Sequence, residues 1–502
     1  MQTDYFKLDI LSPVHIGTGE ELDPMNYLMR REDGLVACHV LDTQSWASDY
    51  PDPDELSAEF SGGNVPAMRG FLANRIEPSI YGLRRIAVSE GRIFQEYEQK
   101  LHDQRTIHQL LFSPHITSSD RIPLIPGSSL KGALRTAVID WLDREKHLGL
   151  KAARAEDFKG KAYQKRLESV LGPITDSAFK QLKLGDVSGY ADSTLLVEPL
   201  EVRRKEGKNV TPKNKCEVMP SRLLGQVEHG ILHARIAMGS LHQPSDRRLT
   251  LPIGQSWNWT ELANVVNAYY RKRFQEEKAK FYGLSNFAKA KPALDQIEAE
   301  LQCNSGQMIL RVGHYSQVEF VTVSDNRPFT RKGKQGTPMP YGTTRTLANG
   351  LFPFGWVRLT PCSEADYLGG IALCEASNRA SQARREEYRT MVLTEKKRRL
   401  EQIRQREELA RQQKEAEQRR QDELDALSYE ERPVVLLERG ELNENQVFEL
   451  FNKFDNLEPA LQTRAAVALK TLWVAQGRWS KKDCSKKQAM KVERIRKILG
   501  KD

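Results

Sequence analysis

The segment 376–428 limits the fold of this chain more than any other, because it contains neither glycine nor proline. Its residues alternate Arg and Lys with Glu and Gln, and few of them are large and apolar. Opposite charges three or four residues apart stabilise an exposed helix. The pattern therefore predicts one long, solvated helix, on the order of 80 Å at about 1.5 Å per residue. Its apolar positions are too irregular to predict a coiled coil.

The chain has 502 residues, too many for one core, so two or three domains are expected. A formal net charge of +9 suits a polyanionic partner. The six cysteines form no C-x-x-C pair, and we predict no zinc site, no other metal and no cofactor. The chain shows neither a leader-like N-terminus nor an apolar run of membrane-spanning length, so we expect a cytoplasmic protein with no membrane partner.

The clearest local motif is the segment 125–136, Ile-Pro-Gly-Ser-Ser-Leu-Lys-Gly-Ala-Leu-Arg-Thr. Ser128 or Ser129, after a Pro-Gly pair, can cap the N-terminus of a helix. Apolar residues then recur at helical spacing along one stripe: Leu130, Ala133, Leu134, Ala137, Val138, Trp141 and Leu142. We therefore predict a helix of about five turns, with Lys131 and Arg135 on a different face.

Strand patterns lie on both sides of this helix. Phe6, Leu8 and Ile10 alternate with charged residues, which is typical of a half-buried strand. The spacing further predicts a mixed, mainly helical region at 70–112, a long hairpin of 195–202 with 227–238, a helix after Trp259, and strands at 308–312, 318–323 and 356–359.

This order of elements favours an α+β fold with two tandem ferredoxin-like (RRM-like) units. We expect the first unit, with a helical insertion, at residues 1–190. The second unit, which begins with the β-hairpin, is expected at 191–375. The charged helix follows at 376–428, and a small basic helical domain at 429–502.

Two glycine-containing segments are candidates for binding a phosphate backbone. A helix N-terminus offers free N–H groups and a positive dipole end, so Gly127, Ser128 and Ser129, with Lys131 and Arg135, form a candidate phosphate cradle. An ordinary capped helix with a solvated basic face explains the same residues. The Gly17-Thr18-Gly19 segment after the first strand is a turn, and its use as a ligand loop is a second interpretation.

Two basic loops are further candidates. Arg331, Lys332 and Lys334 lie in a glycine-rich loop at 331–336, and a basic hairpin tip lies at 203–215. Positively charged grooves follow phosphate backbones, although surface loops of no function have the same composition.

Two residues near the N-terminus have side chains suited to catalysis. His15 could act as a general base in RNA cleavage, and Asp23 could hold a metal or assist attack by a 2′-hydroxyl. A packed, hydrogen-bonded histidine and a solvated acidic turn are the alternatives. The chain contains no Walker loop, no H-E-x-x-H and no G-x-S-x-G motif, so no assembled active site is predicted.

Taken together, four segments in order resemble those of CRISPR RAMP proteins: 11–22, 125–135, 310–315 and 353–359. Their spacing and the chain length are most similar to the fifth subunit of the type III-A Csm effector complex. His314 and Tyr315 stand where that family more often has small, glycine-rich sequence. The residues after 376 lie outside the resemblance.

The resemblance implies a non-catalytic subunit that binds the 3′ part of the guide CRISPR RNA (crRNA). It also implies that the subunit caps the backbone filament and supports crRNA maturation in antiviral defence. The implied neighbours are the adjacent backbone RAMP subunit and the small helical subunit, with target RNA and recruited nucleases as further partners. Carried over by position, the guide contacts would be Gly17, Thr18, Gly19, Gly127, Ser128, Ser129, Lys131, Arg135 and Arg311, with the loop residues Arg331, Lys332 and Lys334.

Three other functions stay open at this point. The chain could be a backbone-type RAMP endoribonuclease that cuts target RNA with Asp23. It could process guide RNA with His15. It could also be a structural adaptor built on the helix at 376–428.

Overall fold

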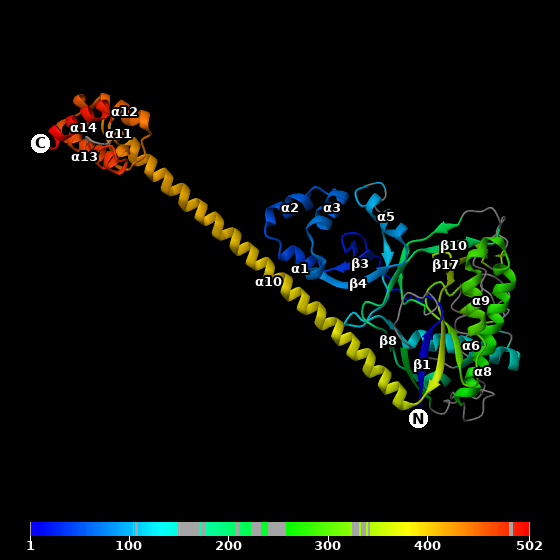
Figure 1. The fold of residues 1–502 in the computed structure, drawn as a ribbon. Helices are drawn as coiled ribbons and strands as arrows, with labels where there is room; N and C mark the ends of the chain where they lie inside the picture. The colour runs from blue at the N-terminus through cyan, green and yellow to red at the C-terminus, as the bar shows by residue number, and fades with distance from the viewer. Residues whose placement is uncertain are drawn as a thin grey trace. The chain divides into compact units, whose positions relative to one another are not determined.

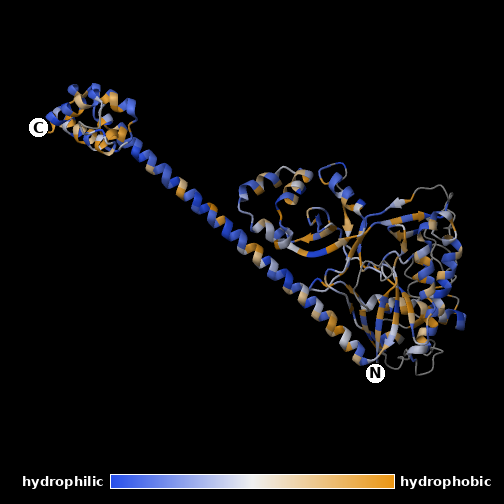
Figure 2. Ribbon diagram, viewed as in Figure 1, coloured by the Kyte–Doolittle hydropathy of each residue, from blue (hydrophilic) through white to orange (hydrophobic). Residues whose placement is uncertain are grey.

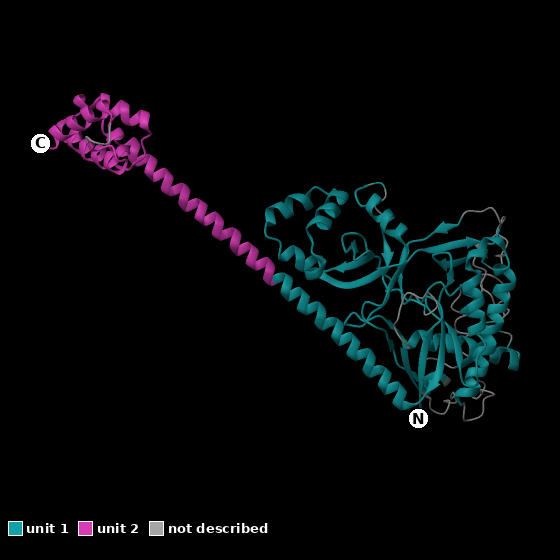
Figure 3. Cartoon of the chain, in the orientation of Figure 1, with its two compact units in different colours: residues 1–393 teal, residues 394–502 magenta. Residues whose placement is uncertain are grey.

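In the computed structural model the chain has two compact units, residues 1–393 and 394–502 (Figures 1 and 3). The structure describes residues 2–103, 105, 109–148, 150, 170–171, 177–205, 210–221, 232–238, 258–323, 331–332, 338–339, 342–480 and 485–500. The first unit mixes helices and strands and the second is helical. The predicted α+β class with a helical C-terminal region is therefore confirmed.

A five-stranded antiparallel sheet contains the first strand of the chain at its centre, in the order β14–β19–β1–β13–β7. The strands are β1 (Gln2–Ile10), β7 (Leu182–Leu184), β13 (Leu232–Met238), β14 (Met308–Arg311) and β19 (Trp356–Cys362). Phe6 and Leu8 of β1 are buried, as their alternation predicts. The sheet thus takes strands from both sides of residue 190, where the sequence suggests a domain boundary.

Two long helices share a hydrophobic core with this sheet: α6 (Gly127–Lys146) and α8 (Trp259–Glu277). Both were predicted, and both are confirmed. The α6 stripe is buried where the spacing requires, with Leu130, Leu134 and Ala137 all fully inaccessible. Asn258 and Glu261 form a capping box that starts α8.

The chain passes through β1, α6, β7, β13, α8 and β19 in the strand–helix–strand–strand–helix–strand order of a ferredoxin-like unit, with β14 added beside β19. The proposal of two such units in tandem, with boundaries at 190, 375 and 428, stays a prediction.

A six-stranded sheet carries the second core of the first unit, in the order β2–β3–β4–β9–β12–β5. Its strands are β2 (Tyr27–Glu32), β3 (Leu35–Leu41), β4 (Gly82–Val88), β5 (Phe112–Ser113), β9 (Leu195–Val197) and β12 (Lys215–Val218). The helices of this region are α1 (Thr43–Ser48), α2 (Pro53–Ser61), α3 (Val65–Arg75), α4 (Pro78–Tyr81) and α5 (Gly91–Lys100). Among the described residues of 70–112, α3, α4 and α5 give the expected helices, and β4 interrupts them because β3 and β9 pair with it on its two sides.

The prediction of a long hairpin between 195–202 and 227–238 is wrong. Strand β13 lies between β1 and β7, whereas β9 pairs with β12. A smaller sheet joins β10 (Pro199–Arg203) to β11 (Thr211–Pro212) and β17 (Thr344–Ala348), and β17 to β18 (Phe352–Pro353). An alternating pattern predicts a strand but does not specify its partner, which here comes from distant sequence.

The expected strand at 318–323 is also wrong, since Val318–Phe320 form the 3₁₀-helix η9. Glu319 is buried there and pairs with Arg345, which a regular alternation of exposed and buried residues would not allow. The remaining short elements of this unit are η4 (Ala178–Gln181), η7 (Lys278–Tyr282), η8 (Ser285–Ala290), α9 (Lys291–Glu300), β6 (Leu124–Ile125), β8 (Val187–Ser188), β15 (Arg331–Lys332) and β16 (Pro338–Met339).

The predicted charged helix is confirmed as α10 (Glu364–Asp425), which begins earlier than residue 376 and is hydrophilic along most of its length (Figure 2). The second unit continues with α11 (Glu431–Glu438), α12 (Glu444–Asn452), η11 (Phe454–Asn456), α13 (Pro459–Ala475) and α14 (Lys486–Ile498). These helices enclose a separate core that includes Val434, Phe454 and Leu469. Among the described residues, no helix combines the length and the apolar character of a membrane span.

Candidate nucleic-acid interface

Three short segments pair side by side next to the exposed Gly17-Thr18-Gly19 turn. The N–H of Ile116 donates to the carbonyl of Ile16 (2.8 Å), and the N–H of Leu124 donates to the carbonyl of Ile116 (3.3 Å). Gly17 and His115 form a further bridge. We call the segments 14–17, 115–117 and 123–125 the glycine-turn ladder. Its last segment leads directly into α6, so the ladder joins two of the segments that resemble RAMP proteins.

The other two segments form backbone hydrogen bonds with the ladder at His15 and with Pro13, the residue just before it. The N–H of His314 donates to the carbonyl of His15 (2.7 Å), and the N–H of Gly355 donates to the carbonyl of Pro13 (2.9 Å). Gly313 has φ +83°, and a Cβ there would lie 2.4 Å from the carbonyl oxygen of His15. Glycine is therefore needed at 313 for the close approach of two chain segments.

The start of α6 differs from the prediction. The helix begins at Gly127 and Pro126 is its N-cap residue, with no side-chain cap, so neither Ser128 nor Ser129 caps it. Instead the N–H of Gly127 donates to Oδ1 of Asp186 (2.8 Å). A carboxylate from another segment thus lies at the helix end that was expected to cradle phosphate. The exposed residues of the first two turns are Ser128 and Gly132.

The two basic residues of the expected cradle are not free surface groups. Lys131 Nζ donates to the carbonyl of Leu182 in β7 (2.9 Å). Burial, together with the nearby charge of Lys183, lowers the pKa of Lys131. Arg135 is half-buried. Lys131 therefore helps to fasten α6 to the sheet.

A buried carboxylate, that of Glu217, holds the ladder from behind. It accepts hydrogen bonds from the backbone N–H of His115 (2.9 Å) and from the hydroxyl of Thr194 (2.6 Å). It also accepts hydrogen bonds from both terminal nitrogens of Arg84 (2.5 and 2.7 Å). The carbonyl of the same residue accepts from Nδ1 of His15 (2.6 Å).

Both histidines of the ladder are structural in this arrangement. His15 is buried, and this burial lowers its pKa. Burial lowers the pKa of His115 to about 4. His115 Nδ1 accepts from the N–H of Ile16 (3.2 Å) while its Nε2 donates to the carbonyl of Leu124 (3.0 Å), which requires the neutral ring.

Asp23 is also engaged. Its Oδ1 accepts from the N–H of Met25 (2.8 Å), and its Oδ2 lies 3.5 Å from the buried guanidinium of Arg69. Within the described ranges, His, Cys, Asp and Glu side chains do not gather in threes or more as they would to hold a metal ion.

Arg311 lies in a buried cluster of charges. Its Nη1 is 2.9 Å from Glu277, and its Nε donates to the carbonyl of Phe354 (2.8 Å). Arg345 bridges Glu277 (2.5 Å) and Glu319 (2.9 Å). Burial alone would raise the pKa of Glu277, but the two guanidiniums outweigh it and hold that pKa below its usual range. Arg311 is only 2% exposed, so it has no surface to offer a ligand.

The basic loops give less information. Arg331 and Lys332 form β15, which pairs with β16, and Lys334 lies outside the described residues. In the hairpin tip, Lys213 pairs with Glu201 (2.8 Å) and Lys215 with Glu96 (2.7 Å).

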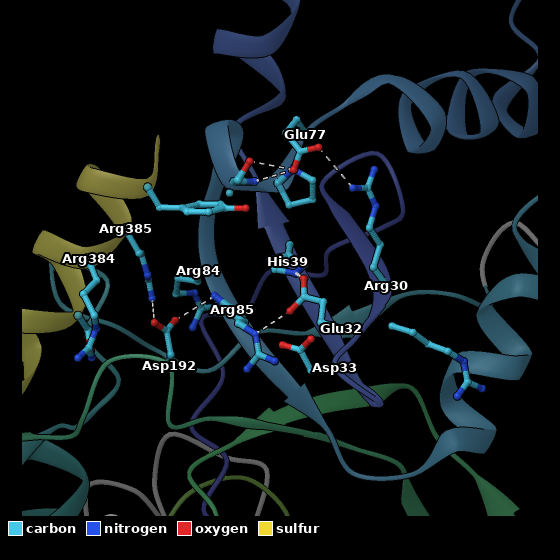
Figure 4. Close-up of a pocket in the computed structure, with 16 residues that line it drawn as sticks. Arg30, Glu32, Asp33, His39, Glu77, Arg84, Arg85, Asp192, Arg384 and Arg385 are labelled. Atoms are coloured by element: carbon cyan, nitrogen blue, oxygen red, sulfur yellow. Dashed lines mark hydrogen bonds and ion pairs between the residues drawn. The ribbon is translucent and has the colours of Figure 1, made fainter. Parts of the chain in front are cut away.

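The structure also brings together residues that the sequence analysis did not select. Arg30 and Arg31 of β2, Arg84 and Arg85 of β4, and Arg384 and Arg385 of α10 line one pocket (Figure 4). The sequence contains these as three separate Arg-Arg pairs. Only their repetition could have drawn attention to them, because the pairs lie far apart along the chain.

The chain is similar in sequence to known proteins. The model of the RAMP superfamily matches residues 7–223, which include the glycine-turn ladder. The Methanocaldococcus jannaschii protein named CRISPR system Cms protein Csm5 is 28% identical over 189 residues. The chain resembles Csm5 of the CRISPR RAMP proteins.

The Csm5 match covers 36% of this chain and 41% of the relative, so the chain spans about two fifths of that protein's length. Among solved structures, a chain of a Csm–crRNA–target RNA ternary complex from a type III-A system is 20% identical, with a TM-score of 0.49 over 72% of this chain and all of that one. The Csm5 crystal structure from T. onnurineus is 19% identical, with a TM-score of 0.46 over 70% of this chain and 99% of that one.

Proposed function

We propose that this chain is a non-catalytic, RNA-binding subunit of a type III CRISPR effector complex. In this proposal it binds the 3′ part of the crRNA, caps the backbone filament and supports crRNA maturation. The observation that carries the proposal is the glycine-turn ladder, where all four RAMP-like segments are hydrogen-bonded to one another or lead into one another. The resemblance to Csm5 supports the choice of complex.

The exposed parts of this site suit sequence-independent contact with RNA. Gly17, Thr18 and Gly19 are exposed, and Gly19 has φ +89° with open space around its missing Cβ. Because glycine has no side chain, phosphate and 2′-hydroxyl groups can approach the backbone closely at Gly17 and Gly19. Ser128 and Gly132 are exposed on the first two turns of α6, and the proposal assigns them to the same RNA surface. Lys131 and Arg311 are assigned to support of the fold, whereas the roles of Arg135, Arg331, Lys332 and Lys334 stay open.

The environments of the two candidate catalytic residues support a non-catalytic role. A general base needs access to the proton it removes, and His15 is only 3% exposed, with Nδ1 committed to a carbonyl. Asp23 shares its charge with Arg69. The adjacent backbone RAMP subunit and the small helical subunit are the proposed neighbours, and target RNA and recruited nucleases are further proposed partners.

Gly132 offers a direct test, because its Cβ position is open and a substitution there should not disturb the fold. Gly132→Glu places a carboxylate on the proposed RNA surface, and Gly132→Gln is the uncharged control of equal size. Both should stabilise α6 by about 0.5–1 kcal/mol, since glycine is a poor helix former. We expect only the Glu variant to weaken binding of a crRNA-like single strand, about 10-fold.

The measurement is RNA affinity of the full chain, followed by protection of the crRNA 3′ end in the assembled complex. Equal affinity of the two variants and the unaltered chain would contradict the proposed surface. Cleavage of complementary RNA that is lost in an Asp23→Asn complex would contradict the non-catalytic assignment.

A further inference from the structure

The arginine-lined pocket of the first unit has a volume of about 720 Å³, within the range of roughly 300–1,000 Å³ found for ligand sites. Its walls come from β2, from β4 and the start of α4, and from α10 between Ser381 and Tyr388. In Figure 4 Arg385 of α10 reaches toward Asp192, beside Arg84 and Arg85 of β4. Six guanidiniums and four carboxylates line it, a formal excess of two positive charges.

Most of these charges are already paired. Arg85 Nε lies 3.1 Å from Glu32, and Arg30 Nη1 lies 3.7 Å from Glu77. Arg385 pairs with Asp192, whose Oδ1 also accepts from the backbone N–H of Arg85 (3.1 Å). These pairs fix the walls of the pocket in place.

Arg31 and Arg384 are different. Arg384 donates to the hydroxyl of Ser381 (3.3 Å), and the guanidinium of Arg31 lies 5.2 Å from the ring centre of Phe94. In the described part of the chain, neither forms an ion pair with a carboxylate. Both side chains are exposed, and planar guanidinium groups match phosphate oxygens in two-point hydrogen bonds.

The remaining carboxylate, that of Asp33, allows a test in which a substitution should raise the affinity for an anionic ligand. It lies in the β2–β3 turn with φ 48°, is exposed, and makes no ion pair with another described residue. A negative charge at the rim opposes an anionic ligand. Removing it should tighten binding, which loss of a merely structural residue would not do.

Tyr388 adds an aromatic surface, since it lines the pocket and is 53% exposed. Exposed aromatic rings beside a line of positive charge are the combination that binds single-stranded nucleic acid, because bases stack on the rings while cations meet the phosphates. A long acidic peptide would use the guanidiniums but not the ring.

The pocket also connects to the glycine-turn ladder. Arg84 lines the pocket, and its guanidinium is held by the buried carboxylate of Glu217. The same carboxylate holds the backbone of His115 in the ladder. A ligand in the pocket and one on the ladder would therefore rest on a shared, rigid support.

We propose that this pocket binds the phosphodiester groups of single-stranded RNA through Arg31 and Arg384, with a base stacked on Tyr388. It is a second RNA contact, beyond the glycine-turn ladder. The identity of the ligand rests on the proposed function. The pocket uses other residues than the ladder, so an experiment can exclude one of the two sites without excluding the other.

The test uses the full chain and a fluorescent oligouridylate, with affinity measured by anisotropy over a series of salt concentrations. The double variant Arg31→Gln/Arg384→Gln should bind about 10-fold more weakly. Its logarithmic salt slope should be smaller by about 1.4, because each phosphate contact to a single strand contributes roughly 0.7. Asp33→Asn should bind about two- to threefold more tightly, since asparagine also tolerates positive φ.

The matched control is Arg379→Gln. Arg379 is an exposed arginine of the same helix, paired with Glu375 and absent from the pocket, so its loss should leave affinity unchanged. An unaltered slope in the double variant, with weakened binding in Gly132→Glu, would overturn the pocket and leave the ladder. Weakened binding in the double variant alone would support the pocket and overturn the ladder. Binding of oligoglutamate, but not RNA, through Arg31 and Arg384 would overturn the proposal in favour of an acidic protein partner.

Discussion

Two groups of arginines in the first unit meet carboxylates in opposite ways. Arg311 and Arg345 are at most 3% exposed and both pair with Glu277, while Arg345 also pairs with Glu319, in an almost fully enclosed cluster. In the arginine-lined pocket the pairs are partly exposed, and Arg31 and Arg384 have no ion pair within the described residues. The charges of the buried cluster pair with one another, whereas the pocket has positive charge available for a ligand.

This difference teaches that arginine in a sequence does not by itself indicate a nucleic-acid contact. Arg311 was selected because of its place in a RAMP-like segment, and Arg384 was not selected. Burial decides which of the two is available to a ligand. A charge taken out of water must be paired inside the protein, whereas an exposed charge can remain unpaired until a ligand binds.

The largest effect should come from breaking the buried cluster. Arg311→Ala leaves Glu277 buried with less compensation, and we expect a loss of about 3–5 kcal/mol in the free energy of unfolding. Chemical denaturation of the full chain measures it, with the transition of the first unit followed separately from that of the second. A loss below about 1 kcal/mol would show that water enters the cluster, and the contrast with the pocket would then disappear.

The next effect concerns His115, the buried histidine of the glycine-turn ladder. His115 has a folded pKa of about 4, below the unfolded value of about 6.5. Its contribution to stability is therefore complete above pH 6.5 and is lost as the pH falls toward 4, about 3 kcal/mol in all. Protonation would also place a hydrogen on Nδ1, against the N–H of Ile16 that it now accepts.

Unfolding measured from pH 4 to 7 tests this prediction. His115→Gln, which cannot titrate, should give a flatter pH profile than the unaltered chain. An identical slope in His115→Gln would place the acid sensitivity in other groups.

The smallest effect is expected for an arginine of the pocket. Arg384→Ala should change the free energy of unfolding by less than about 0.5 kcal/mol, as expected for an exposed side chain without an ion pair. Denaturation midpoints, compared with those of Arg311→Ala, give the contrast directly. A large loss would mean that Arg384 supports the fold, and the pocket would belong with the buried cluster.

The sequence by itself determined the elements whose signal is local. The stripe from Leu130 to Leu142 specified α6, the capping box at Asn258 helps to start α8, and the charged segment without glycine or proline specified α10. Each depends on residues three or four apart, where helix geometry leaves little choice. The four RAMP-like segments were recognised by their resemblance to a known family, which rests on short local runs of sequence.

Only the tertiary structure decided which segments meet. Alternation predicts a strand without its partner, so β13 lies beside β1 and not in the expected hairpin. Asp186, far away in the sequence, accepts a hydrogen bond from the N-terminus of α6, and Arg311 pairs with Glu277 inside the core. The pocket needed three Arg-Arg pairs from separate elements to lie together. Pairing and burial depend on contacts between residues far apart in the chain, and neither propensity nor spacing encodes them.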